Sequence, residues 1–214
     1  VDILNAAGHD AAVLHLSPGY RLKWFRNQTR VTCIQERQPT AADILAVPET
    51  MAAGAMRVFS PDVPKVVVCQ NSYYSFASVS IRDEAHPFRN PSVRRVMCVS
   101  EDNKEALGWC FPGLDVQRAI VGIDAERFSY VEDKGKVIAY MSRKHDEEAQ
   151  VVLQMLRWRG SLEGWSVINI NGVSHNLVAA ALGKTAIFLS TRYPEAQPLP
   201  PLDAMARGCA VVGY

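Results

Sequence analysis

Short apolar runs alternate along this chain with stretches of helical spacing, and this alternation is the strongest constraint on its fold. In the first half we expect strands at 11–16, 43–47, 65–69, 95–99 and 116–121, with a helix at 101–109. In the second half we expect strands at 136–141, 166–170, 186–190 and 210–212, with helices at 146–158 and 176–182. Such alternation is typical of α/β proteins whose parallel sheets are covered on both faces. The sequence therefore predicts an α/β fold built on parallel sheets.

The composition limits the classes of function. The 214 residues, 48% of them hydrophobic, can form one large or two small α/β domains with their own cores. The 23 basic and 22 acidic residues give a net charge of +1, without the basic surface on which nucleic-acid binding depends. The sequence shows neither a run of about eighteen apolar residues, as a membrane span needs, nor a signal peptide. We therefore expect a cytoplasmic protein with no nucleic-acid partner.

The cysteines and histidines do not predict a metal site. The five cysteines form no C-x-x-C pair, and three lie in apolar runs, so we expect small buried side chains in a reducing compartment. The five histidines lack the spacing of metal ligands, and the chain has no D-x-D pair of the kind that holds a divalent ion. His86 is expected in an exposed loop rather than in a ligand cleft.

The C-terminal segment carries the strongest functional signal. It is expected to run strand, polar loop, helix, strand, with Glu195 just before the helix and Asp203 eight positions later inside it. Open α/β sheets hold polyhydroxylated, negatively charged ligands at the carboxyl ends of their strands, where such a loop lies. Pro200 and Pro201 suit the first turn of the helix, and Gly208 suits its end.

The apolar spacing of this helix indicates which way Asp203 points. Leu202, Met205 and Ala206 fall at helical spacing and are expected to face a sheet, which leaves Asp203 nearer the ligand crevice. A plainer interpretation is that Asp203 favours the positive end of its helix and Glu195 is a solvated loop charge.

Three motifs resemble those of retaining, nucleotide-sugar-dependent glycosyltransferases of the GT-B fold. The family's E-x7-E region is close to E-G-F-G-L-P-P-L-E-A-M-A-C-G-C-P-V-V, and this chain matches it with L-P-P-L at 199–202, A-M-A at 204–206 and G-C at 208–209. Upstream, V-G-I-D-A-E-R-F at 121–128 resembles the family's crossing segment between domains, N-G-V-D-x-x-R-F. The run V-I-A-Y-M-S-R-K at 137–144 resembles its Y-V-G-R strand end. Three motifs in the family's order are more specific than any one alone.

The resemblance implies two Rossmann-like domains in the GT-B arrangement, an acceptor-side domain at 1–125 and a nucleotide-sugar-binding domain at 126–214. It also implies metal-independent transfer of a hexosyl unit, with retention, from a nucleotide-diphosphate sugar to a glycan, a lipid-linked acceptor or another hydroxyl, as in polysaccharide biosynthesis. The nucleotide sugar is then a substrate, no cofactor is expected, and peripheral membrane association is compatible with the activity. Residues 1–10 resemble the end of a first helix with its G-H turn, and the chain stops near a strand, so we expect a fragment incomplete at both ends.

The resemblance also assigns roles to individual residues. Arg143 and Lys144, at a strand end, would stabilise the leaving diphosphate, Glu195 would bind the donor sugar's hydroxyls, and Asp203 would bind the nucleotide ribose. The other positions expected to contact the donor are Ala196, Gln197, Leu199, Asn171 and Gly172, and those expected on the acceptor side are Asn71 and Tyr73. The plainer alternative is that the two basic residues are solvated and that positions 171–172 form only a turn.

The sequence also departs from the family pattern. Ala196, Gln197 and Pro198 stand where the family has glycines, and proline has no N–H to offer a donor. Asp203 replaces a glutamate, Ser142 replaces a glycine, and acidic residues occupy 147–148, near the family's usual lysine. Two alternatives to a transferase therefore stay open: a non-catalytic sugar-nucleotide-binding or scaffold protein, and a nucleotide-sugar epimerase of the same architecture.

Overall fold

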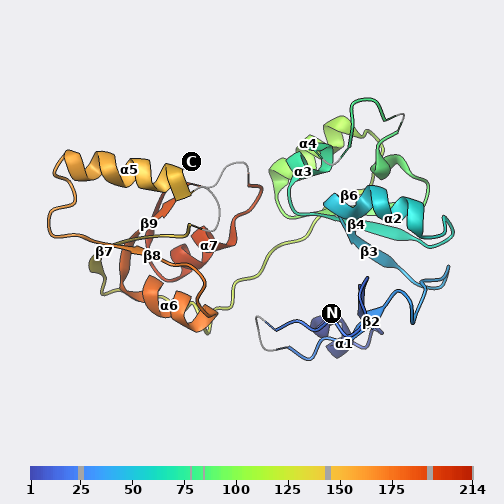
Figure 1. The fold of residues 1–214 in the computed structure, drawn as a ribbon, viewed down its shortest axis with the longest axis horizontal. Helices are drawn as coiled ribbons and strands as arrows, with labels where there is room; N and C mark the ends of the chain where they lie inside the picture. The colour runs from blue at the N-terminus through green and yellow to red at the C-terminus, as the bar shows by residue number, and fades with distance from the viewer. Residues whose placement is uncertain (24–26, 78, 84, 143–145, 192–194, 214) are drawn as a thin grey trace.

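The computed structural model describes residues 1–23, 27–77, 79–83, 85–142, 146–191 and 195–213. Within these ranges the protein is α/β, and its strands form a two-stranded and two four-stranded sheets in which every pairing is parallel. Figure 1 shows the two larger sheets in separate lobes joined by an extended segment. The prediction of an α/β fold with parallel sheets is confirmed.

The first large sheet has the strand order β3-β4-β5-β6, which follows the chain. Its strands are β3 (Leu45–Pro48), β4 (Lys65–Cys69), β5 (Val93–Cys98) and β6 (Val116–Arg118). The helices between them are α2 (Ala52–Val58), α3 (Ser72–Ala77) and α4 (Glu101–Cys110), with the short 3₁₀ turns η1 (Glu49–Met51) and η2 (Pro87–Arg89). Every step along the chain moves to the next strand in the same direction.

This sheet buries only one of its faces. Val67 and Val96, which are opposite each other in register, are fully buried with Leu107 of α4 in one core cluster. On the other face Val66 is half-buried and Met97 is exposed. Right-handed crossovers that always step in one direction put successive helices on the same side of a sheet. The prediction that both faces are covered is therefore wrong for this sheet within the described residues.

The second large sheet has the order β10-β9-β7-β8, so its strands do not follow the chain. The strands are β7 (Gly135–Tyr140), β8 (Ser166–Asn169), β9 (Thr185–Ser190) and β10 (Ala210–Gly213), and the helices are α5 (Asp146–Trp158), α6 (His175–Lys184) and α7 (Leu199–Ala206). Both faces are covered. Ala139 packs with residues of α6 and α7, whereas its neighbour Ile138 packs with Ala149 and Leu153 of α5.

The remaining elements lie before and between the two large sheets. Helix α1 (Asp2–Ala6) precedes β1 (Val13–His15) and β2 (Val31–Cys33), which form the two-stranded sheet. After β6, the N–H of Ala119 still donates to the carbonyl of Cys98 in the first sheet, at 2.7 Å. From Phe128, whose side chain is buried in the second sheet's core, the chain belongs to the other lobe.

The helix in the E-x7-E-like segment begins and ends as expected but faces differently. Pro200 and Pro201 lie in the first turn of α7, and Gly208 has a φ of 88°, the left-handed conformation that closes a helix. Ala204 is fully buried, whereas Met205 is 51% exposed. The prediction that Met205 faces the sheet is therefore wrong, because the proline-led first turn points residues 201 and 204 inward.

Two further predictions concern side chains outside any site. Four of the five cysteines, Cys33, Cys69, Cys98 and Cys209, are buried, and all five are free thiols, as expected. His86 is half-buried rather than exposed, and it caps the start of η2. Its ring packs against Phe88 and Phe111, with centroids 4.6 and 4.7 Å away, and this burial lowers the pKa of the imidazole. Among the helices of the described ranges, none combines the length and apolar character needed to cross a bilayer.

Candidate functional site

The strand order of the second sheet places a topological switch point between β7 and β9. The chain passes from β7 to β8 on one side and then returns to place β9 on the other side of β7. The connections that leave the carboxyl ends of β7 and β9 therefore diverge to opposite faces of the sheet. Ligands of open α/β sheets bind outside the strand ends at such a switch point.

A pair of side chains joins the ends of two strands at this edge. Ser142 follows β7, and Asn169 is the last residue of β8. The Asn169 side-chain amide donates to Ser142 Oγ at 2.8 Å, and the Ser142 N–H donates to Asn169 Oδ1 at 3.3 Å. Two hydrogen bonds between residues 27 positions apart fix the backbone at the point where the Y-V-G-R-like strand end finishes. Ser142, the departure from the family's glycine, is thus used to hold this edge.

Asp203 is the described residue of this region with the most perturbed acidity. It lies on α7, half-buried, and burial raises the pKa of its carboxyl to about 6. His175 and Arg127 oppose this rise because positive charge favours the carboxylate, while Asp124 adds to it. An acid that is partly desolvated and flanked by cations is a recurrent feature of ligand sites in clefts.

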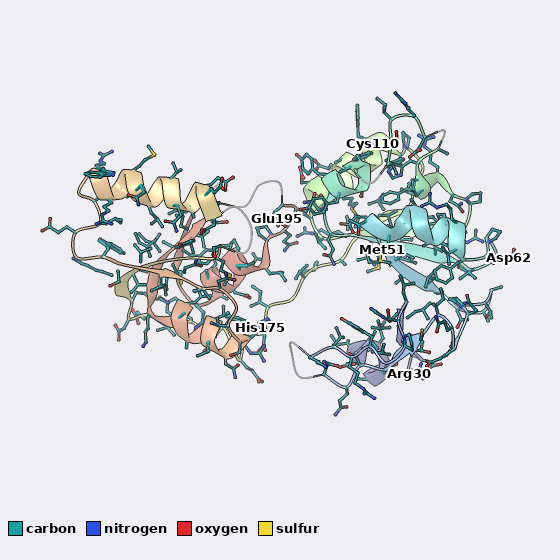
Figure 2. The ribbon with its side chains drawn as sticks, viewed as in Figure 1. Arg30, Met51, Asp62, Cys110, His175 and Glu195 are labelled. Atoms are coloured by element: carbon teal, nitrogen blue, oxygen red, sulfur yellow. The ribbon has the colours of Figure 1, made fainter. Side chains whose placement is uncertain are left out.

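The groups around Asp203 come from two other parts of the chain. His175 is the first residue of α6, and Arg127 and Asp124 belong to the segment that enters this lobe before β7. Asp124 accepts from the backbone N–H of Arg127 at 3.1 Å, and its carboxylate lies 3.3 Å from the guanidinium of Arg127. Figure 2 shows His175 and Glu195 on the side of the lobe along which this segment runs. Residues of the 121–128 motif and of the E-x7-E-like segment therefore share one electrostatic environment.

The loop before α7 places its side chains at the rim of this region. Glu195, Ala196 and Gln197 are half-buried, and Leu199, at the start of α7, is exposed. Gln197 Oε1 is inaccessible to solvent and has no hydrogen-bond partner among the described residues. A buried amide oxygen without a partner is unfavourable, so a donor from a ligand or water is expected there.

Four other residues were assigned roles from the resemblance, and the structure describes two of them. Arg143 and Lys144 lie outside the described residues. Asn171 and Gly172 form an exposed turn after β8, in which Gly172 has a φ of 66°, so the plainer expectation of a turn holds for their backbone. Their contact with a donor stays a prediction.

The carboxyl edge of the first sheet carries a buried polar network that the sequence did not reveal. Glu49, directly after β3, accepts from the N–H of Asn71 at 3.2 Å. Asn103 of α4 accepts from the N–H of Ser72 at 3.3 Å and is 1% exposed, and its Nδ2 has no hydrogen-bond partner in the described chain. Neither Glu49 nor Asn103 stands in a motif. The only sequence signal was their position just after strands.

Of the two residues expected on the acceptor side, only Tyr73 is exposed. Asn71 is almost fully buried, and its Oδ1 accepts from the N–H of Tyr73 at 3.0 Å, which caps the start of α3. Asn71 therefore stabilises the first turn of α3, while Tyr73 is 51% exposed to solvent. Contact of either residue with an acceptor stays a prediction.

Across the described ranges, histidine, cysteine and acidic side chains form no group of three that could hold a metal ion.

Two comparisons with known proteins give no relative of this chain. A scan against models of protein families finds none that matches the chain, and a search of curated proteins finds no significant match.

Proposed function

We propose that this chain is part of a retaining glycosyltransferase of the GT-B type, with Rossmann-like lobes and a nucleotide-sugar donor bound at the carboxyl edge of the second sheet. The observation that carries the proposal is the meeting of the motif residues at one place. Asp203, on the helix that follows β9, shares its environment with Arg127 and His175, and the Ser142–Asn169 pair joins the ends of β7 and β8 at the carboxyl edge of the same sheet. Carboxylates and amides at such an edge suit the hydroxyls of a ribose and a sugar.

In this proposal each site residue has a separate role in the transfer reaction. The bond between the anomeric carbon and the diphosphate breaks, and the acceptor oxygen bonds to the same face of that carbon while its proton passes to a phosphate oxygen. Arg143 and Lys144 would neutralise the charge that develops on the leaving diphosphate. Glu195 would orient the sugar, and Asp203 the ribose. The acceptor, a glycan, a lipid-linked sugar or another hydroxyl, would approach from the lobe that carries Tyr73, in a cytoplasmic protein.

The test is calorimetric titration with nucleoside diphosphates and nucleotide sugars. We expect one nucleotide to bind and Arg143→Ala to weaken it by about 1–3 kcal/mol, the usual contribution of charge-assisted hydrogen bonds. Glu195→Ala should weaken the nucleotide sugar but not the free diphosphate, because only the sugar hydroxyls are lost. Arg94→Ala, which removes an exposed arginine of β5, is the matched control and should change neither affinity. Folded protein that binds no nucleotide at all would refute the proposal.

A second candidate, a sugar-nucleotide-binding protein without transferase activity, is favoured by one observation. Pro198 is the residue that caps α7, and it offers no N–H where a donor phosphate would approach. Release of nucleoside diphosphate in the presence of a panel of glycan acceptors separates the two candidates. Binding of a nucleotide sugar with no turnover on any acceptor supports the binding protein, and diphosphate release supports the transferase.

A further inference from the structure

Helix α5 carries an apolar stripe that nothing in the described structure covers. Val151, Met155 and Trp158 are 59%, 67% and 86% exposed. Their spacing of four and three residues places them on one face of the helix, opposite Leu153 and Ala149, which pack on the sheet. Figure 1 shows α5 along the outer edge of its lobe, with strands on one side of it and no other element on the other side.

The charges at the two ends of α5 are opposite in sign. Its first turn holds Asp146, Glu147 and Glu148, and Arg157 and Arg159 lie at its end. Glu147 and both arginines make no ion pair with any described side chain. An α5 from another molecule, laid antiparallel on the stripe, brings each acidic end against the partner's arginines. A parallel arrangement would bring like charges together.

We propose that α5 is a self-association surface, on which a second copy of this chain docks its own α5 antiparallel across a two-fold axis. With the axis near Leu153, Val151 of one copy faces Met155 of the other, and Glu147 faces Arg159. Such an interface is isologous and closes at a dimer. The stripe from Val151 to Trp158 is about 10 Å long, at 1.5 Å per residue. A single stripe of this length buries less than the roughly 1,600 Å² of a standard interface, so the dimer is weak and is expected in the upper half of the concentration range tested below.

A hollow lies beside the arginine end of α5. The chain leaves α5 through Gly160, whose φ is 78°, and a hollow of about 420 Å³ opens there, lined by Arg157, Gly160, Leu162 and Glu163. Trp158, the most exposed residue of the stripe, is expected to contribute most to the affinity, because large aromatic side chains dominate the energy of protein interfaces. An anionic lipid bilayer is the alternative partner for this stripe. The acidic residues at the start of α5 disfavour it, because negative charges repel anionic lipids.

The experiment is sedimentation velocity of the full chain from 5 to 300 μM. Wild type is expected to shift from monomer to dimer, and Trp158→Glu should raise the dissociation constant at least about tenfold. Ile44→Glu, at an apolar residue of the other lobe that is 72% exposed, is the matched control and should leave the dissociation constant unchanged. Thermal unfolding by circular dichroism confirms that each variant is folded.

A charge reversal tests the antiparallel arrangement itself. Glu147→Arg and Arg159→Glu should each weaken the dimer, and the double variant should recover at least half of the lost affinity, because each reversed end again meets its opposite. Wild type that stays monomeric at 300 μM, a dimer that resists Trp158→Glu, or a double variant without recovery would each overturn the proposal. Binding of wild type, but not of Trp158→Glu, to vesicles of phosphatidylserine and phosphatidylcholine would assign the stripe to a lipid surface instead.

Discussion

Asp203 is expected to destabilise the folded protein at neutral pH, and replacing it with asparagine should remove this cost. Burial raises the pKa of its carboxyl from 3.8 to about 6. The folded state therefore binds the proton more tightly than the unfolded state. A carboxyl of this kind contributes stability below its unfolded pKa, and the contribution is lost as the pH rises from about 4 to about 6. Above pH 6 the charged side chain carries the full cost of its burial.

The size of the effect follows from the shift. A difference of about two pKa units corresponds to about 3 kcal/mol, at 1.36 kcal/mol per unit. Asp203 is only half-buried, so solvent screens part of this energy and we expect about 1–2 kcal/mol. Asparagine has nearly the same volume and no charge. Asp203→Asn should therefore be more stable than wild type by that amount at pH 8.

Urea unfolding at pH 5 and pH 8, followed by tryptophan fluorescence, measures the difference. The gain in stability from Asp203→Asn should shrink at pH 5, where the wild-type carboxyl is mostly protonated in the folded protein. Asp133→Asn removes an exposed aspartate of the same lobe and should change stability by less than about 0.5 kcal/mol at either pH. A gain that is equal at both pH values, or a loss of stability at pH 8, would refute the reasoning, because burial would then not dominate.

The same variant connects stability to function. Residues that bind ligands are often kept in positions where they cost stability. If Asp203 binds a ribose, Asp203→Asn should gain stability and lose nucleotide affinity together, as calorimetry can show. A variant that gains stability and keeps its affinity would leave Asp203 outside the donor site.

Three further perturbations test the packing. Leu107→Ala, at a fully buried position under the first sheet, should cost about 2–5 kcal/mol in urea unfolding. His86→Gln should flatten the loss of stability as the pH falls below 6.5, since burial lowers the pKa of the wild-type imidazole and the unfolded state takes up the proton first. Lys134→Met should cost about 2 kcal/mol in the same assay, because the Lys134 ammonium donates to the carbonyls of Leu182 and Arg207 at 3.1 and 2.7 Å.

The sequence predicted those elements whose local signals agree. Strand β4 and helix α5 have the predicted bounds, 65–69 and 146–158. Helix α5 has an acidic first turn and a glycine, Gly160, that closes it, so propensity, charge and stop signal coincide. Strand β2 was missed because three residues, V-T-C, are too short to show a period.

The position of the site could be predicted only in part, because strand order is a long-range property. The E-x7-E-like segment correctly indicated a strand, a loop and a helix around Asp203. No local pattern showed that β9 lies beside β7, which creates the switch point, or that Arg127 lies in the electrostatic environment of Asp203. The facing of Met205 was wrong for a related reason. Apolar spacing identifies a face of a helix, but the first turn decides which face the sheet receives.

Two buried polar residues at the amino ends of strands have local partners. Lys65, the first residue of β4, donates to the carbonyls of Ser60 and Val63, both at 2.9 Å. Thr185, the first residue of β9, donates to Ala181, four positions earlier. These bonds close turns and helix ends, so they serve the local backbone.

At the carboxyl ends the partners are distant in sequence. Glu49 bonds to residue 71, Ser72 to residue 103 and Ser142 to residue 169, separations of 22, 31 and 27 residues. Each bond links the ends of successive strands, and both unpartnered buried amide groups, on Asn103 and Gln197, lie in segments that follow such ends. Binding sites need side chains held rigidly by neighbours from other elements. The amino edge of the second sheet has long-range links as well, since the Lys134 ammonium donates to the carbonyls of Leu182 and Arg207. What distinguishes the carboxyl edges is the pair of buried amide groups without a partner among the described residues, and these support a ligand site there independently of any motif.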